Sequence, residues 1–297
     1  MTRGDGPSRK ADASTGAPAR QAPRRAPARD FELEAGSFAH YEDPAYYASS
    51  YASRIEDVAY YVALAQRSPG PVLEYGVGNG RIAIPIARHG RNVVGVDHSA
   101  PMLADLRARV AREPAEVAAR VSAVRGDMRR VRLKRRFPLV LATFNTALHL
   151  YVRDDVERFL ARVREHLAPG GRFVVDLSMP TIADLARMAG RAYSVPRFRH
   201  PTTGLVVKNR EYFDYDPLRQ VLFVSMEFVP VSDPAAAWIT PLAHRQFFPR
   251  EWEALLHYNG FDVDHVDGDF EGGLLTKDSD VMVWHAKHAT RRPKGRP

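Results

Sequence analysis

Three glycines occupy every second position between residues 76 and 80, directly after an apolar run that begins at Val72. They are Gly76, Gly78 and Gly80, and Glu74 stands two residues before the first. Glycine lacks a Cβ atom, so the chain can turn sharply here and bring backbone N–H groups close to a ligand at the start of the next helix. The nearby carboxylate disfavours a pyrophosphate and favours positive charge. We therefore expect a nucleotide-like cofactor that carries a cationic group.

Two acidic residues follow the next two predicted strands. Asp97 lies 21 residues after Gly76, where a carboxylate can accept hydrogen bonds from both hydroxyls of a ribose, although a helix N-cap is the alternative. Asp127 can accept a hydrogen bond from an adenine amino group. The dinucleotide fingerprint would need a glycine where this chain has Arg81, and the phosphate-binding P-loop pattern is absent. The three signals together favour an adenosine-containing ligand of another kind.

Short apolar runs alternate with helix-like periodicity around these residues, which indicates a parallel sheet covered on both faces. Residues 37–66 predict one or two helices before the first strand. The predicted strands are residues 72–75, 92–96, 121–124, 139–144 and 172–177, and the helices between them are 82–90, 102–112 and 154–167. Residues 205–215, 221–231 and 238–248 predict a three-stranded antiparallel insert, followed by a helix over 249–258 and strands over 261–270 and 280–287. The fold class is therefore α/β, with a doubly wound sheet of about seven strands and an insert after the fifth.

The formal charge of +8 comes from the two ends of the chain, and the body between them is neutral. Composition predicts disordered basic tails over 1–30 and 289–297. The predicted elements indicate a core with N-terminal lid helices over 31–202, the insert over 203–248 and the end of the core over 249–288. The basic run from Arg125 to Arg136 is read as a solvated loop, with nucleic-acid contact as the alternative. Because the body is neutral, we expect no nucleic-acid partner.

The chain contains no cysteine, which excludes disulfides, thiolate nucleophiles and cysteine-ligated metals. Among the histidines only His285 and His288 are closely spaced, near the C-terminal end, so the sequence predicts no metal site. No apolar run is long enough for a membrane span, and no secretory signal is present. We therefore expect a cytoplasmic protein without a membrane partner. The sequence leaves homo-oligomerisation open.

The segment from Glu74 to Gly80 resembles motif I of the class I S-adenosylmethionine-dependent methyltransferases. Residues 96–99 are similar to the acidic end of their second strand, residues 126–128 to their adenine loop, and residues 167–173 to the turn before their fifth strand. The segment from Phe144 to Leu150 and the late residues 268–270 resemble glycine N-methyltransferase and amino-sugar N,N-dimethyltransferases. The resemblance covers residues 38–288 and implies a Rossmann-like fold with S-adenosylmethionine as cofactor.

The resemblance also implies a role for each matching position. Glu74 and the backbone of Gly76, Gly78 and Gly80 would face the methionyl ammonium, Asp97 the ribose, Met102 and Met128 the two adenine faces, and Asp127 the adenine amino group. Asn145 would lie near the methyl donor. Tyr47, Tyr51 and Arg54 would close over the site as a lid, with Arg54 a candidate partner for the methionyl carboxylate. For the two tyrosines, plain helix packing is the alternative.

The implied reaction is methylation of a small molecule, at an amine nitrogen. A protonated amine has no lone pair, so a nearby acceptor helps to deliver the neutral form. His149, with an ordinary pKa of about 6.5, is the candidate base or orienting group. The alternative role for His149 is structural, as a histidine that is hydrogen-bonded within the wall of the loop. The second interpretation is O- or C-methylation of a small metabolite. Two further alternatives are a nucleic-acid methyltransferase and a cofactor-binding protein without turnover.

Overall fold

The computed structural model describes residues 30–289. The predicted tails, 1–30 and 289–297, therefore lie outside the described residues except for Asp30 and Ala289. Among the helices of the described part, none combines the length and the apolar character needed to cross a bilayer.

Seven strands form one sheet in the order β10-β11-β5-β4-β1-β2-β3. All neighbouring pairs are parallel except those that involve β11, which runs antiparallel to both β5 and β10. The strands are β1 (Val72–Tyr75), β2 (Val93–Asp97), β3 (Val121–Arg125), β4 (Phe137–Ala142), β5 (Leu167–Ser178), β10 (Phe261–Asp267) and β11 (Val281–His288). This arrangement confirms the predicted doubly wound α/β sheet. It places the carboxyl ends of β1, β2 and β4 side by side, which is where such sheets bind ligands.

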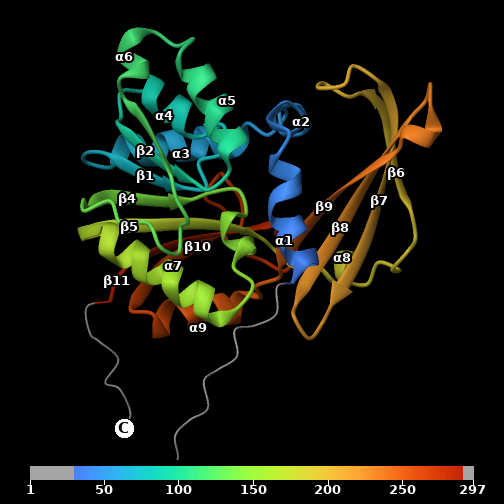
Figure 1. Cartoon of the computed structure of the whole chain (residues 1–297). Coiled ribbons are helices and arrows are strands. Elements are labelled where there is room, and N and C mark those ends of the chain that lie inside the picture. The colour runs from blue at the N-terminus through green and yellow to red at the C-terminus, as the bar shows by residue number, and fades with distance from the viewer. Residues whose placement is uncertain (1–29, 290–297) are drawn as a thin grey trace, which may run out of the picture. The chain divides into compact units, whose positions relative to one another are not determined.

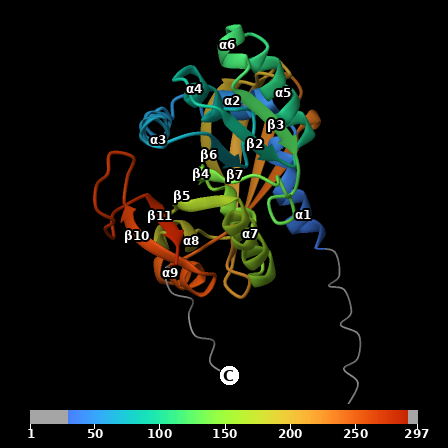
Figure 2. The ribbon, with the colours of Figure 1, turned by 90° about the vertical axis from the view of Figure 1, so that its left-hand side faces the viewer.

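Helices cover both faces of this sheet (Figure 1 and Figure 2). One buried cluster joins α7 and α9 to the sheet, and a second joins α3, α4 and α5 to the opposite face. The helices that cover the sheet are α3 (Glu56–Arg67), α4 (Ala83–Arg88), α5 (Ala100–Val110), α6 (Ala115–Ala118), α7 (Arg153–His166) and α9 (Pro249–Tyr258). The apolar strands that the sequence predicted are thus buried on both sides.

The insert is a separate antiparallel sheet of four strands, in the order β6-β7-β8-β9. The strands are β6 (Tyr193–Arg199), β7 (Val206–Asp216), β8 (Val221–Pro230) and β9 (Trp238–Arg245), with the short helices α8 (Ile182–Leu185) and η3 (Pro234–Ala236) beside them. The prediction of three strands was one too few, because β6 was not recognised. β6 is an edge strand whose register shifts around Pro196, and proline is tolerated at just such an edge.

The N-terminal helices connect the insert to the main sheet. They are α1 (Phe31–Phe38), η1 (Ala39–Tyr41) and α2 (Pro44–Ser50). β9 contacts α1, η1 and the short helix η2 (Thr146–His149) that follows β4. Tyr46 of α2 packs with Met226 and Phe228 of the insert in a small buried cluster and stacks on the ring of His200. The lid helices therefore contact both the insert and the end of β4.

Candidate functional site

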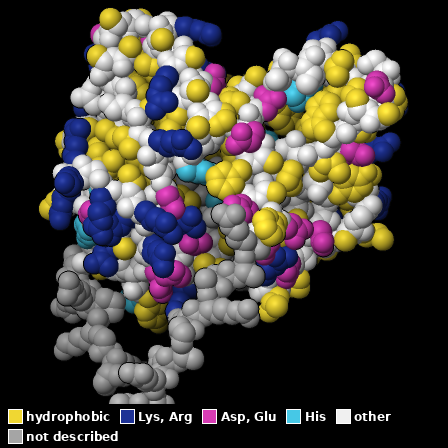
Figure 3. Space-filling model, viewed as in Figure 1, with side chains coloured by type: hydrophobic (Ala, Val, Ile, Leu, Met, Phe, Trp, Pro, Cys, Tyr) yellow, Lys and Arg dark blue, Asp and Glu magenta, His cyan; other side chains and the backbone are white. Residues whose placement is uncertain are grey.

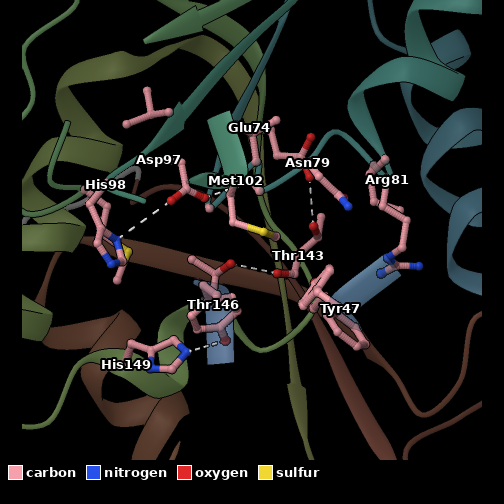
Figure 4. A pocket seen from close by; sticks show the side chains of 18 of the residues that line it. Tyr47, Glu74, Asn79, Arg81, Asp97, His98, Met102, Thr143, Thr146 and His149 are labelled. Atoms are coloured by element: carbon pink, nitrogen blue, oxygen red, sulfur yellow. Dashed lines mark hydrogen bonds and ion pairs between the residues drawn. The ribbon is translucent and has the colours of Figure 1, made fainter. Parts of the chain in front are cut away.

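A cavity lies at the carboxyl ends of β1, β2 and β4 and encloses about 730 Å³ of empty space, part of it open to solvent. Figure 4 shows Glu74, Asp97 and Met102 around one end of it and His149 at the other. The predicted site residues that line the cavity are Tyr47, Glu74, Gly76, Gly78, Asp97, Met102, Met128 and His149. The fold thus brings together most of the residues that the sequence singled out.

The glycine turn after β1 forms the floor of the cavity. Gly76 has φ +67° and Gly78 has φ +52°, in the left-handed region that favours glycine. A Cβ atom on Gly76 would lie 2.1 Å from Oγ1 of Thr146, so any other residue would collide with the loop after β4. Gly80 does not line this cavity. A Cβ atom there would lie 2.4 Å from Leu106 of α5, so its role in the structure is close helix packing.

Glu74 is a buried carboxylate with one unpaired oxygen. Its side chain is part of the cavity wall, and the residue is only 1% exposed. Oε1 accepts a hydrogen bond of 2.9 Å from Oγ1 of Thr143, whereas Oε2 has no partner. Burial raises the pKa of Glu74 to about 8, although the Thr143 hydrogen bond lowers it. A ligand ammonium group beside Oε2 would satisfy this oxygen and favour the charged form. The site therefore fits the cationic end of the predicted cofactor.

Asp97 is held in place by two backbone N–H groups at the end of β2. Oδ2 accepts 2.8 Å from the N–H of Gly78, and Oδ1 accepts 2.8 Å from the N–H of Ser99. The N-cap of α5 is Ser99, whose hydroxyl accepts from the N–H of Met102, so the alternative role of Asp97 as a helix cap is wrong. Each carboxylate oxygen keeps a further lone pair that can accept from a hydroxyl. This geometry suits a ribose diol.

Met102 and Met128 both line the cavity, as does Gly126 between β3 and Met128. Asp127 does not. Burial raises the pKa of Asp127, but hydrogen bonds from Arg129 outweigh this and hold it below its usual value. The Nη2 and Nε atoms of Arg129 each lie 2.9 Å from an oxygen of Asp127, and its Nη1 lies 2.8 Å from Asp155. Asp127 is thus committed to an ion pair that organises the loop, and the cavity wall is formed by its neighbours.

The basic run from Arg125 to Arg136 includes Arg129, so these ion pairs offset part of its positive charge. Arg132 pairs with Glu165 at 2.8 Å, in addition to the pairs of Arg129. Figure 3 shows basic and acidic side chains interspersed on the face of the molecule that Figure 1 presents. Arg129 and Arg132 of the run thus have acidic partners, and its interpretation as a solvated loop stays a prediction.

The predicted lid residues divide between the cavity and its surroundings. Tyr47 lines the cavity, whereas Tyr51 and Arg54 do not. The hydroxyl of Tyr51 lies 3.0 Å from Nε2 of His40, and the guanidinium of Arg54 lies 5.2 Å from the centre of the Phe144 ring. Tyr51 thus packs within the N-terminal helices, the alternative that the sequence left open.

Arg81, rather than Arg54, is the arginine that lines the cavity. It forms a bidentate pair with Asp57 at 2.5 and 2.7 Å, and its guanidinium lies 4.5 Å from the centre of the Phe144 ring. The sequence carried a signal for it, since Arg81 directly follows the glycine turn. At that position the absence of a glycine excluded a dinucleotide fingerprint, and the arginine itself was not predicted to line the site. Asn79, with its buried amide nitrogen unpartnered, is a second lining residue that was not predicted.

His149 lies in the wall between two tyrosine hydroxyls. Nε2 is 2.7 Å from the hydroxyl oxygen of Tyr41, and Nδ1 is 3.2 Å from that of Tyr151. Tyr151 donates its own proton to the carbonyl of Ala243 at 2.9 Å. Nδ1 of His149 then carries the proton that Tyr151 accepts, and Nε2 accepts from Tyr41. The oxygen of Tyr41, also in the cavity wall, keeps its lone pairs for a ligand.

This environment changes the expected chemistry of His149. Burial lowers its pKa well below 6.5, and the nearby His244, His98 and His40 lower it further. The imidazole is therefore uncharged near neutrality, which favours the predicted orienting role over that of a base that titrates in this range. Burial also raises the pKa of Tyr41 well above 10, so the phenol stays protonated. The pair is an uncharged hydrogen-bonding unit.

Asn145 does not line the cavity, although it directly follows Phe144, which does. Its Nδ2 donates to the hydroxyl of Ser178 at 2.8 Å, and its Oδ1 accepts from the N–H of Ser178 at 2.7 Å. Phe144 and Asn145 both have positive φ, at +53° and +65°. The side chain of Asn145 thus fastens a strained turn to the end of β5.

Comparison with known proteins gives relatives of one kind. Residues 72–171 match the family described as methyltransferase domain. A cypemycin N-terminal methyltransferase from Streptomyces is 33% identical over 217 residues, which cover 71% of this chain and 80% of that protein. The solved structure of the CcbJ methyltransferase from Streptomyces caelestis is similar with a TM-score of 0.68 and 28% identity, over 80% of this chain and 90% of that one. The glycopeptide N-methyltransferase MtfA in complex with S-adenosylmethionine is similar with a TM-score of 0.56 and 26% identity, over 78% and 86% of the two chains.

Proposed function

This chain belongs to the S-adenosylmethionine-dependent methyltransferases, and on that premise we propose that it methylates an amine nitrogen of a small natural-product precursor. The observation that carries this proposal is the uncharged pair of Tyr41 and His149 in the cavity wall. A neutral amine already has the lone pair that attacks the methyl group, so it needs an oriented acceptor for its N–H and no strong base. A phenol or a carbon acid would have to lose a proton first.

Two similar proteins support the nitrogen acceptor by their names. One is described as acting on the N-terminus of cypemycin, and the other is described as a glycopeptide N-methyltransferase. The first name points to a chain N-terminus and the second to a nitrogen of a glycopeptide. We infer an acceptor of the same chemical class here, a primary or secondary amine on a peptide or a sugar.

The cofactor supplies an electrophilic methyl group on a sulfonium centre. In our proposal Glu74 holds the methionyl ammonium through its unpaired Oε2, and Asp97 holds the ribose hydroxyls. Met102 and Met128, which both line the cavity, would pack on the adenine ring. Because a direct displacement gains most from alignment and exclusion of water, these contacts serve mainly to fix the donor.

The acceptor side of the proposed site consists of Tyr41, Tyr47 and His149. Tyr41 donates its hydroxyl proton to Nε2 of His149, so its oxygen accepts the N–H of the amine and turns the nitrogen lone pair toward the methyl group. The product amine carries an extra proton after transfer. Because burial keeps the imidazole of His149 uncharged, the product leaves the site as the ammonium ion and gives up this proton in solvent.

Labelled S-adenosylmethionine tests the proposal against a matched panel of acceptors. The panel holds short peptides with free N-termini, amino sugars, phenols, carboxylates, transfer RNA and duplex DNA at equal concentration. We expect label in the peptides or amino sugars alone. Label confined to phenols or carbon acids would favour O- or C-methylation. Label in transfer RNA or DNA would favour a nucleic-acid methyltransferase. Tight cofactor binding with no transfer to any class would favour a binding protein without turnover.

A further inference from the structure

Two histidines and an aspartate form a cluster on the β10–β11 hairpin, outside the cavity described above. His265 and Asp267 are two residues apart on β10, so their side chains leave the same face of the strand. His285 on β11 is the direct cross-strand partner of His265, and the two imidazole rings stack with their centroids 4.0 Å apart. Strand pairing thus brings together three groups that the spacing along the chain keeps apart.

The separations within this cluster suit a bound cation. Oδ2 of Asp267 lies 3.3 Å from Nε2 of His285, and Oδ1 lies 3.8 Å from Nε2 of His265. One ligand atom from each of the three residues lies within 4.8 Å of the other two. Nitrogen and oxygen ligands bind Zn²⁺ at about 2.0–2.2 Å, which separates them by about 3.4 Å in a tetrahedral site. Small side-chain rotations would therefore complete the geometry.

Burial and charge favour a cation at the same place. The side chain of His285 is 2% exposed and that of Asp267 is 13% exposed, whereas His265 is 47% exposed and gives an ion access from solvent. Asp267 supplies negative charge, which favours a bound cation. Arg172 of β5 supplies positive charge that acts on the same cluster.

Tyr60 of α3 supplies a fourth polar group. Its hydroxyl donates to Oδ2 of Asp267 at 2.6 Å, and its oxygen lies 2.6 Å from Nε2 of His285. Nδ1 of His285 is buried and has no hydrogen-bond partner. Since Tyr60 gives its proton to Asp267, its contact with Nε2 places the imidazole proton on Nε2 when no metal is bound. A metal at Nε2 would replace this hydrogen bond, and the proton would then reside on Nδ1.

We propose that His265, Asp267 and His285 form a binding site for one divalent transition-metal cation of the Zn²⁺ type. His265 and His285 would bind through Nε2 and Asp267 through its carboxylate, with Tyr60 next to the open position. Two imidazoles select Zn²⁺, Ni²⁺ or Cu²⁺ over Mg²⁺ and Ca²⁺, which prefer oxygen ligands alone. The prediction of no metal site rested on the spacing of His285 and His288, and it overlooked the cross-strand pair.

Calorimetric titration of the untagged full chain with Zn²⁺, in a buffer that does not bind metals, tests this site. We expect one Zn²⁺ per chain and a higher melting temperature in its presence, with no binding of Mg²⁺ at the same concentration. His265→Ala and Asp267→Asn should each weaken Zn²⁺ binding at least tenfold, because each removes a ligand. His257→Ala is the matched control, since His257 is exposed on α9 and outside the cluster, and it should bind Zn²⁺ like the unmodified chain.

Three results would overturn the proposal. They are the absence of Zn²⁺ binding below millimolar concentrations, equal binding by His265→Ala and the unmodified chain, and equal loss in His257→Ala and His265→Ala. Because His265 is half exposed, its replacement leaves the fold intact, which circular dichroism verifies. His265→Gln keeps a polar side chain of similar length and provides a second variant with the same expected loss.

Discussion

At the scale of single residues, burial decides what the ionisable groups of the cavity can do. Glu74 and His149 both lie inside the wall, and burial makes the uncharged form of each more stable. For Glu74 a cationic ligand reverses this effect. Within residues 30–289, the groups that surround His149 are other histidines and tyrosine hydroxyls. We therefore expect Glu74 to change its charge when the cofactor binds and His149 to stay neutral.

Cofactor binding is expected to release a proton from Glu74. With its pKa raised to about 8, Glu74 is mostly protonated at pH 7 in the free protein, and the methionyl ammonium favours the carboxylate. Binding at pH 7 then releases about 0.9 proton, and the affinity for S-adenosylmethionine rises from pH 6 to pH 8 and levels off above it. Calorimetry in phosphate and in Tris at pH 7 measures this release from the difference in binding enthalpy. Equal enthalpies in the two buffers would contradict it, and Glu74→Gln, which has no proton to lose, is the control.

Tyr41 and His149 are expected to act as one unit in turnover. Tyr41→Phe removes the oxygen that accepts the amine N–H, and His149→Ala removes the group that orients it, so each lowers kcat by about 10- to 100-fold. The double variant should be no slower than the slower single one. Because the pKa of His149 lies well below neutrality, the pH profile between 6 and 8 should keep its shape.

Steady-state kinetics on the true acceptor measure all three variants, with Tyr258→Phe at an exposed position as the control. Additive losses in the double variant would show that the two residues act separately. Loss of a limb near pH 7 in His149→Ala would restore the role of His149 as an independent base.

At the scale of secondary-structure elements, the lid helices and the insert meet in a tight contact. A Cβ atom on Gly36 of α1 would lie 2.6 Å from Cβ of Ala243 on β9. We expect Gly36→Ala to lower the free energy of unfolding by about 1–3 kcal/mol through overpacking. Chemical denaturation measures this change. Ala243→Gly in the same chain should recover part of it, since the backbone nitrogen of residue 243 stays 2.8 Å from the added atom. Full stability of Gly36→Ala would mean that the contact is loose.

Most elements could be predicted because their signals are local. The helix over 249–258 has its predicted bounds, since Pro249 starts it and Asn259-Gly260 ends it. β6 could not be predicted, because Pro196 and its arginines do not read as a strand until β7 pairs with it. Glu74 and Asp97 could be placed in the site because both stand at strand ends. Tyr41 could not, since it reaches the cavity through η1, whose direction depends on the packed fold, whereas Arg81 was missed although it directly follows the glycine turn.

At the scale of the whole molecule, the cavity is built from residues between Tyr41 and His149. We therefore expect deletion of residues 1–29 and 290–297 together to change kcat/KM for a small acceptor by less than about threefold. Kinetics of the shortened chain, with its circular dichroism spectrum as the control for folding, measure the effect. A much larger loss would show that one of these segments takes part in the site.

The central claim is that the methyl group goes to an amine nitrogen, and isotope-edited NMR of the product tests it most directly. The cofactor carries a ¹³C-methyl group, and the acceptor is the amine that performs best in the panel, next to the same compound with its amine acetylated. We expect a new N-methyl correlation with the free amine and no transfer to the acetylated compound, because acetylation delocalises the nitrogen lone pair. An O-methyl or C-methyl correlation, or equal transfer to both compounds, would contradict it.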